Sequence, residues 1–270
     1  MSFMHFARIA AIVLRQLYLM RGSISRVLPL FVWAGIDIVL WGFITKYLNA
    51  ITSSGVNFVP SLLGAVLLWD FLIRVMQGVT MTFFEDVWSR NFLNIFATPL
   101  SITEYLSGLV LSSIASSSVG LIVMVALATM LFGLSFFVYG LMLVPFFVVL
   151  FMCGIALGIL GSGVVLRFGP PAEWFVWPIP AIISPFVGVF YPLSTLPRWM
   201  RYISRVLPPS HVFEGMRAIV FGKSIAPYGL LWGFGLAVGY ILLACWFFTS
   251  VYRYAVRTGL IARYSAETLS

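Results

Sequence analysis

Three ionisable side chains, Asp37, Asp70 and Arg74, fall inside long apolar stretches of the sequence. A charge at such a position costs free energy unless it faces a cavity or an oppositely charged partner. Asp70 and Arg74 are four positions apart, which places them on one face of a helix, so we expect them to pair. The pair is interpreted as structural, with a role in an ion path as the alternative. Asp37 has no local partner and is expected to face the other helices, near Arg74.

Few other residues could support chemistry. His5 and His211 stand alone, without the set of ligands that a metal needs, and His211 is interpreted as an interface or gate residue. Cys153 and Cys245 lie within apolar runs, which predicts buried free thiols and argues against a disulfide. We therefore expect no catalytic residue, no cofactor and no metal in this chain.

The amino-acid composition excludes a soluble globular domain. Of the 270 residues 61% are hydrophobic and only 9% are charged, with a mean hydropathy of +1.06, whereas soluble domains contain about 25% charged residues. In a bilayer every backbone amide must be satisfied within the protein, so the choice is between helices and a closed barrel. The apolar runs are continuous and do not alternate as barrel strands do. This predicts an all-α integral membrane protein with a single transmembrane domain over residues 1–270.

Six apolar stretches are long enough to cross a membrane. A helix needs about 20 residues to cross a hydrocarbon core of about 30 Å, and this measure predicts spans at about 28–48, 58–82, 104–132, 138–166, 173–192 and 227–252. Six spans place both termini on one face, and that face receives more of the basic residues than the other. Because short cytoplasmic segments retain Lys and Arg, both termini are predicted to be cytoplasmic.

The first residues predict a helix over 3–21 that lies along the membrane surface. On such a helix the polar side chains His5, Arg8 and Arg15 fall on one side, and most of the apolar side chains fall on another. The alternative is an irregular lead-in to the first span. Because Arg15 and Arg21 interrupt the apolar run and no small-residue cleavage site follows, we do not expect a cleaved signal peptide.

The polar stretch after the second span predicts an amphipathic helix over 84–99 on the cytoplasmic side. Polar residues come first, apolar residues follow at helical spacing, and a proline ends the pattern. We expect this helix to offer a partner protein a binding surface made of Glu85, Asp86, Trp88, Arg90, Phe92, Asn94, Phe96 and Pro99. The alternative is an interfacial connector whose aromatic residues lie among lipid head groups.

Residues 193–222 predict a re-entrant segment on the outer side of the membrane. Prolines interrupt the segment too often for a span, because each one removes a helical hydrogen bond. Arg198, Arg201 and Arg205 recur at helical spacing and share one face. We expect a hairpin of two short helices that enters the outer leaflet and returns, where protein or water satisfies the broken backbone.

Three pairs of glycines, each four positions apart, predict close helix packing. The pairs are Gly154 and Gly158, Gly229 and Gly233, and Gly235 and Gly239. The spacing does not distinguish packing within one chain from packing between two copies.

Two stretches of the chain resemble one known family, the type-2 ATP-binding-cassette (ABC-2 type) export permeases. Near the C-terminus the chain is similar to the family signature in the order Gly188, Pro192, Leu196-Pro197, Trp199, Leu207-Pro208-Pro209, Phe213-Glu214 and Arg217. Before the third span it is similar to the family in the stretch from Arg90 through Thr98-Pro99-Leu100-Ser101 to Glu104-Tyr105-Leu106. The resemblance covers essentially the whole chain, including its length, six spans and cytoplasmic ends.

The resemblance implies a non-catalytic permease subunit of an ATP-hydrolysing translocase in a prokaryotic cytoplasmic (inner) membrane. Members of the family work as two permease chains, here a homodimer in membrane lipid, with two ATP-binding subunits and no nucleic acid. The helices at 3–21 and 84–99 would contact the ATPase, the latter as the coupling helix. The short helices at 193–217 would form an outer gate that includes Pro192, Pro197, Trp199, Pro208, His211, Glu214 and Arg217.

ATP and Mg would be bound by the partner subunit. The run at 221–224 resembles the end of a phosphate-binding loop, but Arg217 occupies the position of the required earlier glycine. The coupling segment also departs from the family at 90–94, where many exporters have a more acidic run that contains Gly-Thr. This departure leaves the substrate subfamily open.

Two other classes of function remain as alternatives. An ion-coupled secondary transporter or channel would use Asp37, Asp70 and Arg74, but such carriers carry paired interrupted spans in an internal repeat, and residues 28–132 and 138–252 show no convincing repeat. An intramembrane enzyme would need a convergent nucleophile, base or metal set. The exporter alone explains both the cytoplasmic helix and the outer re-entrant segment.

Overall fold

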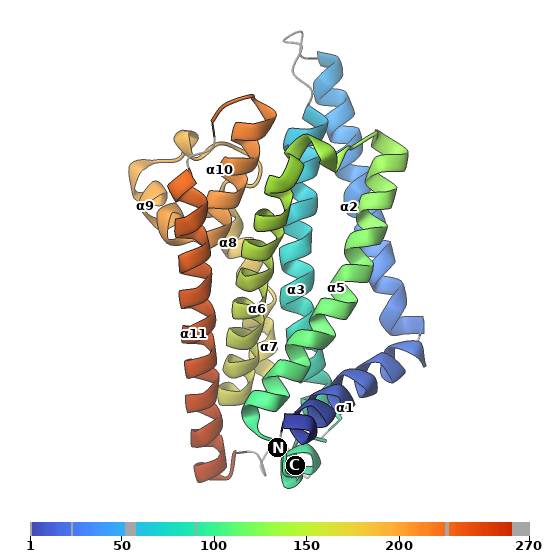
Figure 1. Ribbon diagram of the computed structural model, residues 1–270, viewed down its shortest axis with the longest axis vertical. Coiled ribbons are helices and arrows are strands. Elements are labelled where there is room, and N and C mark those ends of the chain that lie inside the picture. Colours follow the sequence, from blue (N-terminus) through green and yellow to red (C-terminus); the bar gives the residue numbers. More distant parts are fainter. Residues whose placement is uncertain (1, 23, 52–57, 90, 225–226, 261–270) are drawn as a thin grey trace.

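The computed structural model describes residues 2–22, 24–51, 58–89, 91–224 and 227–260. All regular elements in these ranges are helices, and the long ones form an elongated bundle (Figure 1). In chain order they are α1 (Ser2–Arg21), α2 (Ile24–Ile51), η1 (Val59–Leu63), α3 (Gly64–Trp88), α4 (Phe92–Ala97), α5 (Ile102–Phe132), η2 (Phe136–Met142), α6 (Leu143–Phe168), η3 (Pro170–Ala172), α7 (Glu173–Val176), α8 (Ile179–Val187), η4 (Leu193–Thr195), α9 (Arg198–Val206), α10 (Pro208–Val220) and α11 (Pro227–Thr258).

Within the described residues, five helical stretches are long and apolar enough to cross a membrane: Val32–Ile51, Val59–Trp88, Ile102–Phe132, Phe136–Phe168 and Tyr228–Thr258. Each overlaps one of the predicted spans. The start of α1 and the end of α11 lie at the same end of the bundle, which we call the α1 end (Figure 1). The helices α9 and α10 lie toward the opposite end, which we call the α10 end.

The centre of the bundle is α3, which packs against α5 and α6, and α6 packs in turn against α11. The contact between α3 and α6 depends on two glycines. A Cβ atom on Gly154 would come within 2.8 Å of the carbonyl oxygen of Leu72, and one on Gly158 would come within 2.7 Å of the Cβ atom of Val79. These glycines therefore let the two backbones approach each other closely.

The glycines of α11 differ in whether a neighbouring helix lies against them. A Cβ atom on Gly233 would lie 3.0 Å from the Cβ atom of His211, so α11 contacts α10 there. At Gly235 and Gly239 a Cβ atom would meet none of the described atoms within 4 Å. This last pair therefore does not mediate packing within the described part of the chain.

The predicted fifth span at 173–192 is not one long helix. It contains the short helices α7 and α8, separated at Trp177 and Pro178. Pro185 lies inside α8 as well. Proline lacks the backbone N–H that an uninterrupted helix needs, which explains the break.

The predicted helix at 84–99 is divided too, which corrects the expected boundaries. α3 continues through the first part of this stretch to Trp88, and the separate helix α4 covers only Phe92–Ala97. The physical reason is burial: Phe84 and Val87 lie in the core and extend the apolar face of α3 by one more turn.

Residues 193–222 contain η4 and the two short helices α9 and α10. Pro208 and Pro209 begin α10, where their missing N–H groups cost no helical hydrogen bond. The hydroxyl of Ser204 donates to the carbonyl of Phe186, and that of Ser210 donates to the carbonyl of Ser204. These bonds tie α9 to the end of α8 and to the start of α10.

Candidate functional site

A polar cavity of about 620 Å³ lies between α1, α2, α3 and α5, and Trp177 contributes to its wall. Its other apolar lining residues are Met20, Trp33, Ile73 and Met81. Its polar lining residues are Gln16, Asp37, Asp70, Arg74, Gln77, Thr82, Glu85, Ser112, Ser116 and Ser117. Polar groups within apolar helices cost free energy unless they pair with one another or with backbone carbonyls, or face a water-filled path or a ligand.

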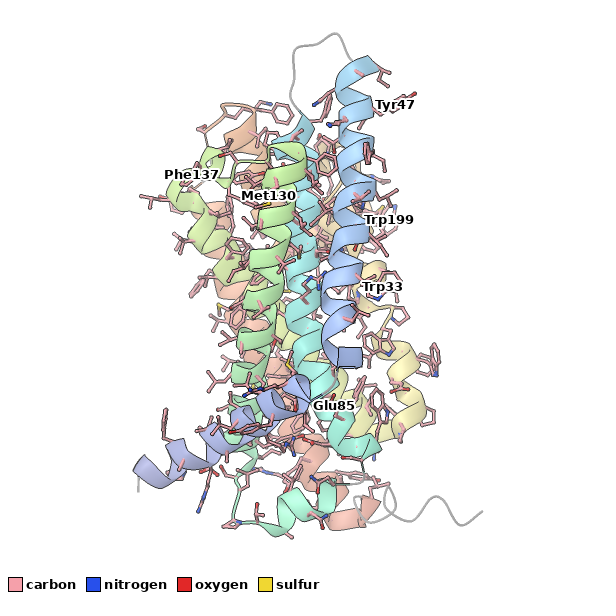
Figure 2. The ribbon with its side chains drawn as sticks, turned by 90° about the vertical axis from the view of Figure 1, so that its right-hand side faces the viewer. Trp33, Tyr47, Glu85, Met130, Phe137 and Trp199 are labelled. Carbon is pink, nitrogen blue, oxygen red and sulfur yellow. The ribbon has the colours of Figure 1, made fainter. Side chains whose placement is uncertain are left out.

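One face of α3 supplies much of this lining. The positions 70, 74, 77, 81 and 85 recur at intervals of three and four residues and therefore stand above one another on the helix. Figure 2 shows Glu85 near the α1 end, where α1 meets α3, and Trp33 on α2 farther along the bundle. The cavity therefore extends from the α1 end into the apolar part of the bundle.

The three intramembrane charges predicted from sequence all line this cavity. Arg74 Nη2 lies 3.6 Å from Asp70 Oδ2, and Arg74 Nε donates a hydrogen bond to Met124 Sδ over 3.0 Å. Asp37 comes from the neighbouring helix α2 and interacts electrostatically with Arg74. The side chain of Arg74 fits beside α5 because residue 120 is a glycine, at which a Cβ atom would lie 3.3 Å from Arg74 Cδ.

Several polar oxygens at the cavity have no hydrogen-bond partner among the described residues. They are Gln16 Oε1, Asp70 Oδ2 and Ser112 Oγ. Gln16 is 7% exposed and Ser112 is 5% exposed, so bulk water reaches neither side chain freely. A buried polar atom without a partner costs free energy, and it marks a place where a bound ligand or water gains a hydrogen bond.

At the α1 end, Asp86 joins three helices. Its Oδ1 accepts a hydrogen bond from Arg15 Nη2 of α1 over 2.6 Å, and its Oδ2 accepts one from the hydroxyl of Tyr105 of α5 over 2.8 Å. Asp86 is 3% exposed and Tyr105 is fully buried. This corrects the expectation that Asp86 faces a partner protein, because its carboxylate is occupied within the chain.

A second polar link joins α1 to the start of α5. Ser101 and Glu104 form a capping box, in which each side chain accepts a hydrogen bond from the backbone N–H of the other residue. The same Glu104 carboxylate bonds to His5 and lies 3.4 Å from Arg8 Nη1. His5 and Arg8 of the polar face predicted on the first helix therefore meet α5, while Arg15 of that face meets α3. Gln16 of α1 also donates to Glu85 Oε2 of α3 over 2.8 Å.

The other predicted coupling residues have varied surroundings. Trp88 is 49% exposed at the end of α3, and Asn94 and Pro99 are exposed at α4 and just after it. Glu85 lines the cavity and bonds to Gln16. Three of the predicted positions lie outside what the structure describes: Arg90, and the side chains of Phe92 and Phe96.

Two of the predicted gate residues hold the α10 end together. Arg217 Nη2 donates to the carbonyl oxygen of Gly188 over 2.6 Å and lies 3.0 Å from Glu214 Oε1, which also accepts from the backbone N–H of Leu193. Burial lowers the pKa of Arg217, and the Glu214 carboxylate opposes this effect by raising the pKa. Gly188 has a φ of +69°, a left-handed conformation that glycine adopts without strain.

The remaining gate residues differ in exposure. Pro192, Pro197 and Trp199 are exposed and Pro208 is buried. His211 Nε2 lies 3.0 Å from the carbonyl oxygen of Arg205. No group of three or more His, Cys, Asp or Glu side chains that could hold a metal ion occurs among the residues that the structure describes.

The long apolar helices define a multi-pass helical membrane protein, and a cavity lined by both polar and apolar side chains lies among them. A family model described as ABC-2 family transporter protein matches residues 13–248. The chain therefore belongs to the ABC-2 family of transporter proteins, a membrane transport component of ABC exporters, and the resemblance seen in the sequence is confirmed. A search of curated proteins gave no match.

Proposed function

We propose that the chain is the membrane-spanning permease subunit of an ATP-driven exporter and that its polar cavity is part of the translocation path. The observation that carries the proposal is the cavity itself, which brings Asp37, Asp70 and Arg74 together in a chain of this transporter family. Two copies of the chain work as a homodimer with two ATP-binding subunits, which hold ATP and Mg. The assembly lies in a prokaryotic cytoplasmic membrane.

The proposed topology has six crossings, with both termini in the cytoplasm. α7 and α8 together complete the fifth crossing, although prolines break the helix. The α1 end is then cytoplasmic and the α10 end is outside, where α9 and α10 form the re-entrant pair and the outer gate. α1 lies in the cytoplasmic interface of the membrane.

The proposed coupling surface consists of α1, α4 and the exposed Trp88. A contact with the ATPase there reaches the cavity through α1, because Arg15 holds α1 to Asp86 of α3 while the neighbouring Gln16 and Glu85 form cavity wall. A movement of α1 relative to α3 therefore changes the shape of the cavity at its cytoplasmic end. In this way nucleotide-driven movement of the partner alters access to the translocation path.

Purification of the tagged chain from gently solubilised native membranes tests the proposal. We expect an ATP-binding subunit to co-purify in a one-to-one ratio with the permease, together with ATPase activity. A clean preparation without such a subunit, which mediates ion flux in liposomes, would instead support the ion-coupled carrier that uses the same three charges.

The substitution Trp88→Ala tests the coupling surface. Exposed tryptophans are frequent anchors of protein interfaces, and truncating one costs about 2 kcal/mol or more of binding free energy, so we expect the ATPase subunit to dissociate during purification. Tyr228→Ala is the matched control, because Tyr228 is 82% exposed at the start of α11. Equal recovery of the ATPase with both variants would contradict the assignment of Trp88.

A further inference from the structure

The charges that line the cavity are unbalanced. Among the described lining residues three are carboxylic acids, Asp37, Asp70 and Glu85, and one is basic, Arg74. The whole chain, in contrast, has a formal net charge of +8. Because the single guanidinium already faces Asp70 at 3.6 Å, the cavity has an excess of negative charge that a cation would neutralise.

The lining atoms without a described hydrogen-bond partner also favour a ligand that donates hydrogen bonds, as a protonated cation does. Gln16 Oε1 and Asp70 Oδ2 have no hydrogen-bond partner among the described residues, and both atoms are acceptors when Asp70 is ionised. Ser112 Oγ, which is also without a described partner, can accept as well. A ligand that satisfies this set must therefore donate hydrogen bonds.

The rest of the lining is apolar and aromatic. Trp33 and Trp177 contribute indole rings, and Met20, Ile73 and Met81 contribute aliphatic surface. Tryptophan faces also attract cations through the ring quadrupole. The ligand is therefore expected to combine an apolar body with a cationic, hydrogen-bond-donating group.

We propose that the cavity binds amphipathic cations whose charged group is a protonated amine. The ammonium lies at Asp37 and Asp70 and donates a hydrogen bond to Asp70 Oδ2, while the apolar body packs against Trp33 and Trp177. An anionic ligand at the same place would meet the carboxylates of Asp37 and Asp70. Binding of such a cation does not depend on an ATPase partner. Only its transport rests on the proposed function as an exporter.

Binding of matched fluorescent probes to the purified full-length permease tests this inference. The probes are dansylcadaverine, which carries a primary ammonium, its neutral N-acetyl derivative, and dansyl-aminohexanoate, which carries a carboxylate. We expect the amine to bind at least about tenfold more tightly than the acetylated probe, as one charge-assisted hydrogen bond would provide. The carboxylate probe should not compete.

Two variants locate the binding site. Asp37→Asn and Asp70→Asn should each weaken binding of the amine by about tenfold or more, whereas Glu173→Gln, which removes a carboxylate outside the lining of the cavity, should bind as the unmodified protein does. If Asp70→Asn fails to fold because Arg74 loses its partner, Asp37→Asn and the comparison of probes decide the question. Equal binding of the amine and its acetylated form, tighter binding of the carboxylate, or undiminished binding by Asp37→Asn would overturn the proposal.

The binding experiment and the co-purification experiment can fail independently of each other. Loss of the amine site in a chain that still co-purifies with an ATP-binding subunit would overturn only the inference about the ligand. Specific amine binding by a chain that has no such subunit would overturn the exporter and leave the ligand class standing.

Discussion

Asp86 shows what a single carboxylate does at the α1 end. Its two oxygens bond to Arg15 of α1 and Tyr105 of α5, while its backbone belongs to α3. A carboxylate this deeply buried is tolerable only because both oxygens have donors. The residue therefore fixes the position of α1 on the bundle, which a surface residue could not do.

A double-mutant cycle tests this role of Asp86. Arg15→Leu leaves the carboxylate buried without its charged partner and is expected to destabilise the protein by about 3 kcal/mol. In Arg15→Leu combined with Asp86→Asn, the amide oxygen still accepts from Tyr105 and no unpaired charge remains, so part of the stability should return. Thermal unfolding in detergent measures these two variants and the single substitution Asp86→Asn that completes the cycle.

The outcome of that cycle is informative in either direction. If the double variant melts above Arg15→Leu, the cost of the single substitution is the orphaned charge. If the two losses simply add, Asp86 and Arg15 act independently and do not hold α1 in place.

Glycine pairs with the same spacing have different surroundings in α6 and in α11. Gly154 and Gly158 allow α6 to approach α3, whereas Gly235 and Gly239 of α11 meet none of the described atoms. The same four-residue spacing therefore has different consequences, and the sequence alone does not distinguish them.

Gly154→Ala and Gly239→Ala form a matched pair that tests this difference. The added methyl at 154 would lie 2.8 Å from the backbone oxygen of Leu72, which cannot move without shifting α3. We expect a loss of about 1–3 kcal/mol from this overpacking. Gly239→Ala should leave the melting temperature unchanged or raise it, since alanine favours a helix by up to about 1 kcal/mol. Equal melting temperatures for the two variants would refute the contact.

The long helices were predictable from sequence because their signal is local. Continuous apolar runs predicted five of the long helices, and the polar face at 5–15 predicted a helix along the membrane surface but not its contacts with α3 and α5. The i, i+4 spacing of Asp70 and Arg74 predicted their pairing, and extending the same spacing to Gln77 and Glu85 would have revealed the polar stripe of the cavity.

The features that were not predicted depend on contacts between residues far apart in the chain, which leave no local sequence pattern. Arg15 and Asp86 are 71 positions apart, so nothing near either residue identifies the other. The continuation of α3 to Trp88 reflects burial of Phe84 and Val87 by other helices, which outweighs the polar residues that suggested a separate helix. The helix breaks at 173–192 fall at prolines that are visible in the sequence. The prediction of one span there relied on the apolar composition of the stretch and did not take these prolines into account.

The proposed orientation in the membrane makes opposite predictions for the two ends of the bundle. Figure 2 shows Met130 and Phe137 at the end far from Glu85, and Phe137 is 94% exposed. Asn94 is exposed in α4 at the α1 end. The two positions should therefore lie on opposite sides of the membrane.

Cysteine labelling in intact cells measures this orientation. A membrane-impermeant maleimide should modify Phe137→Cys at once and Asn94→Cys only after the membrane is permeabilised. Cys153 is buried and Cys245 is partly buried within α11, and the unmodified protein serves as the control for their labelling. The reverse pattern would place both termini outside the cell and contradict the proposed cytoplasmic coupling surface.

The link between His5 and Glu104 has a consequence for the order of biosynthesis. The two residues are 99 positions apart in the chain, so the ribosome makes α1 long before its main docking site on α5 exists. Until the third long helix has been synthesised and inserted, the polar face of α1 has no carboxylate at Glu104 to bind. Docking of the first helix is therefore completed late in assembly, and nascent chains arrested before Glu85 and Asp86, its earliest partners, should leave α1 accessible to proteases.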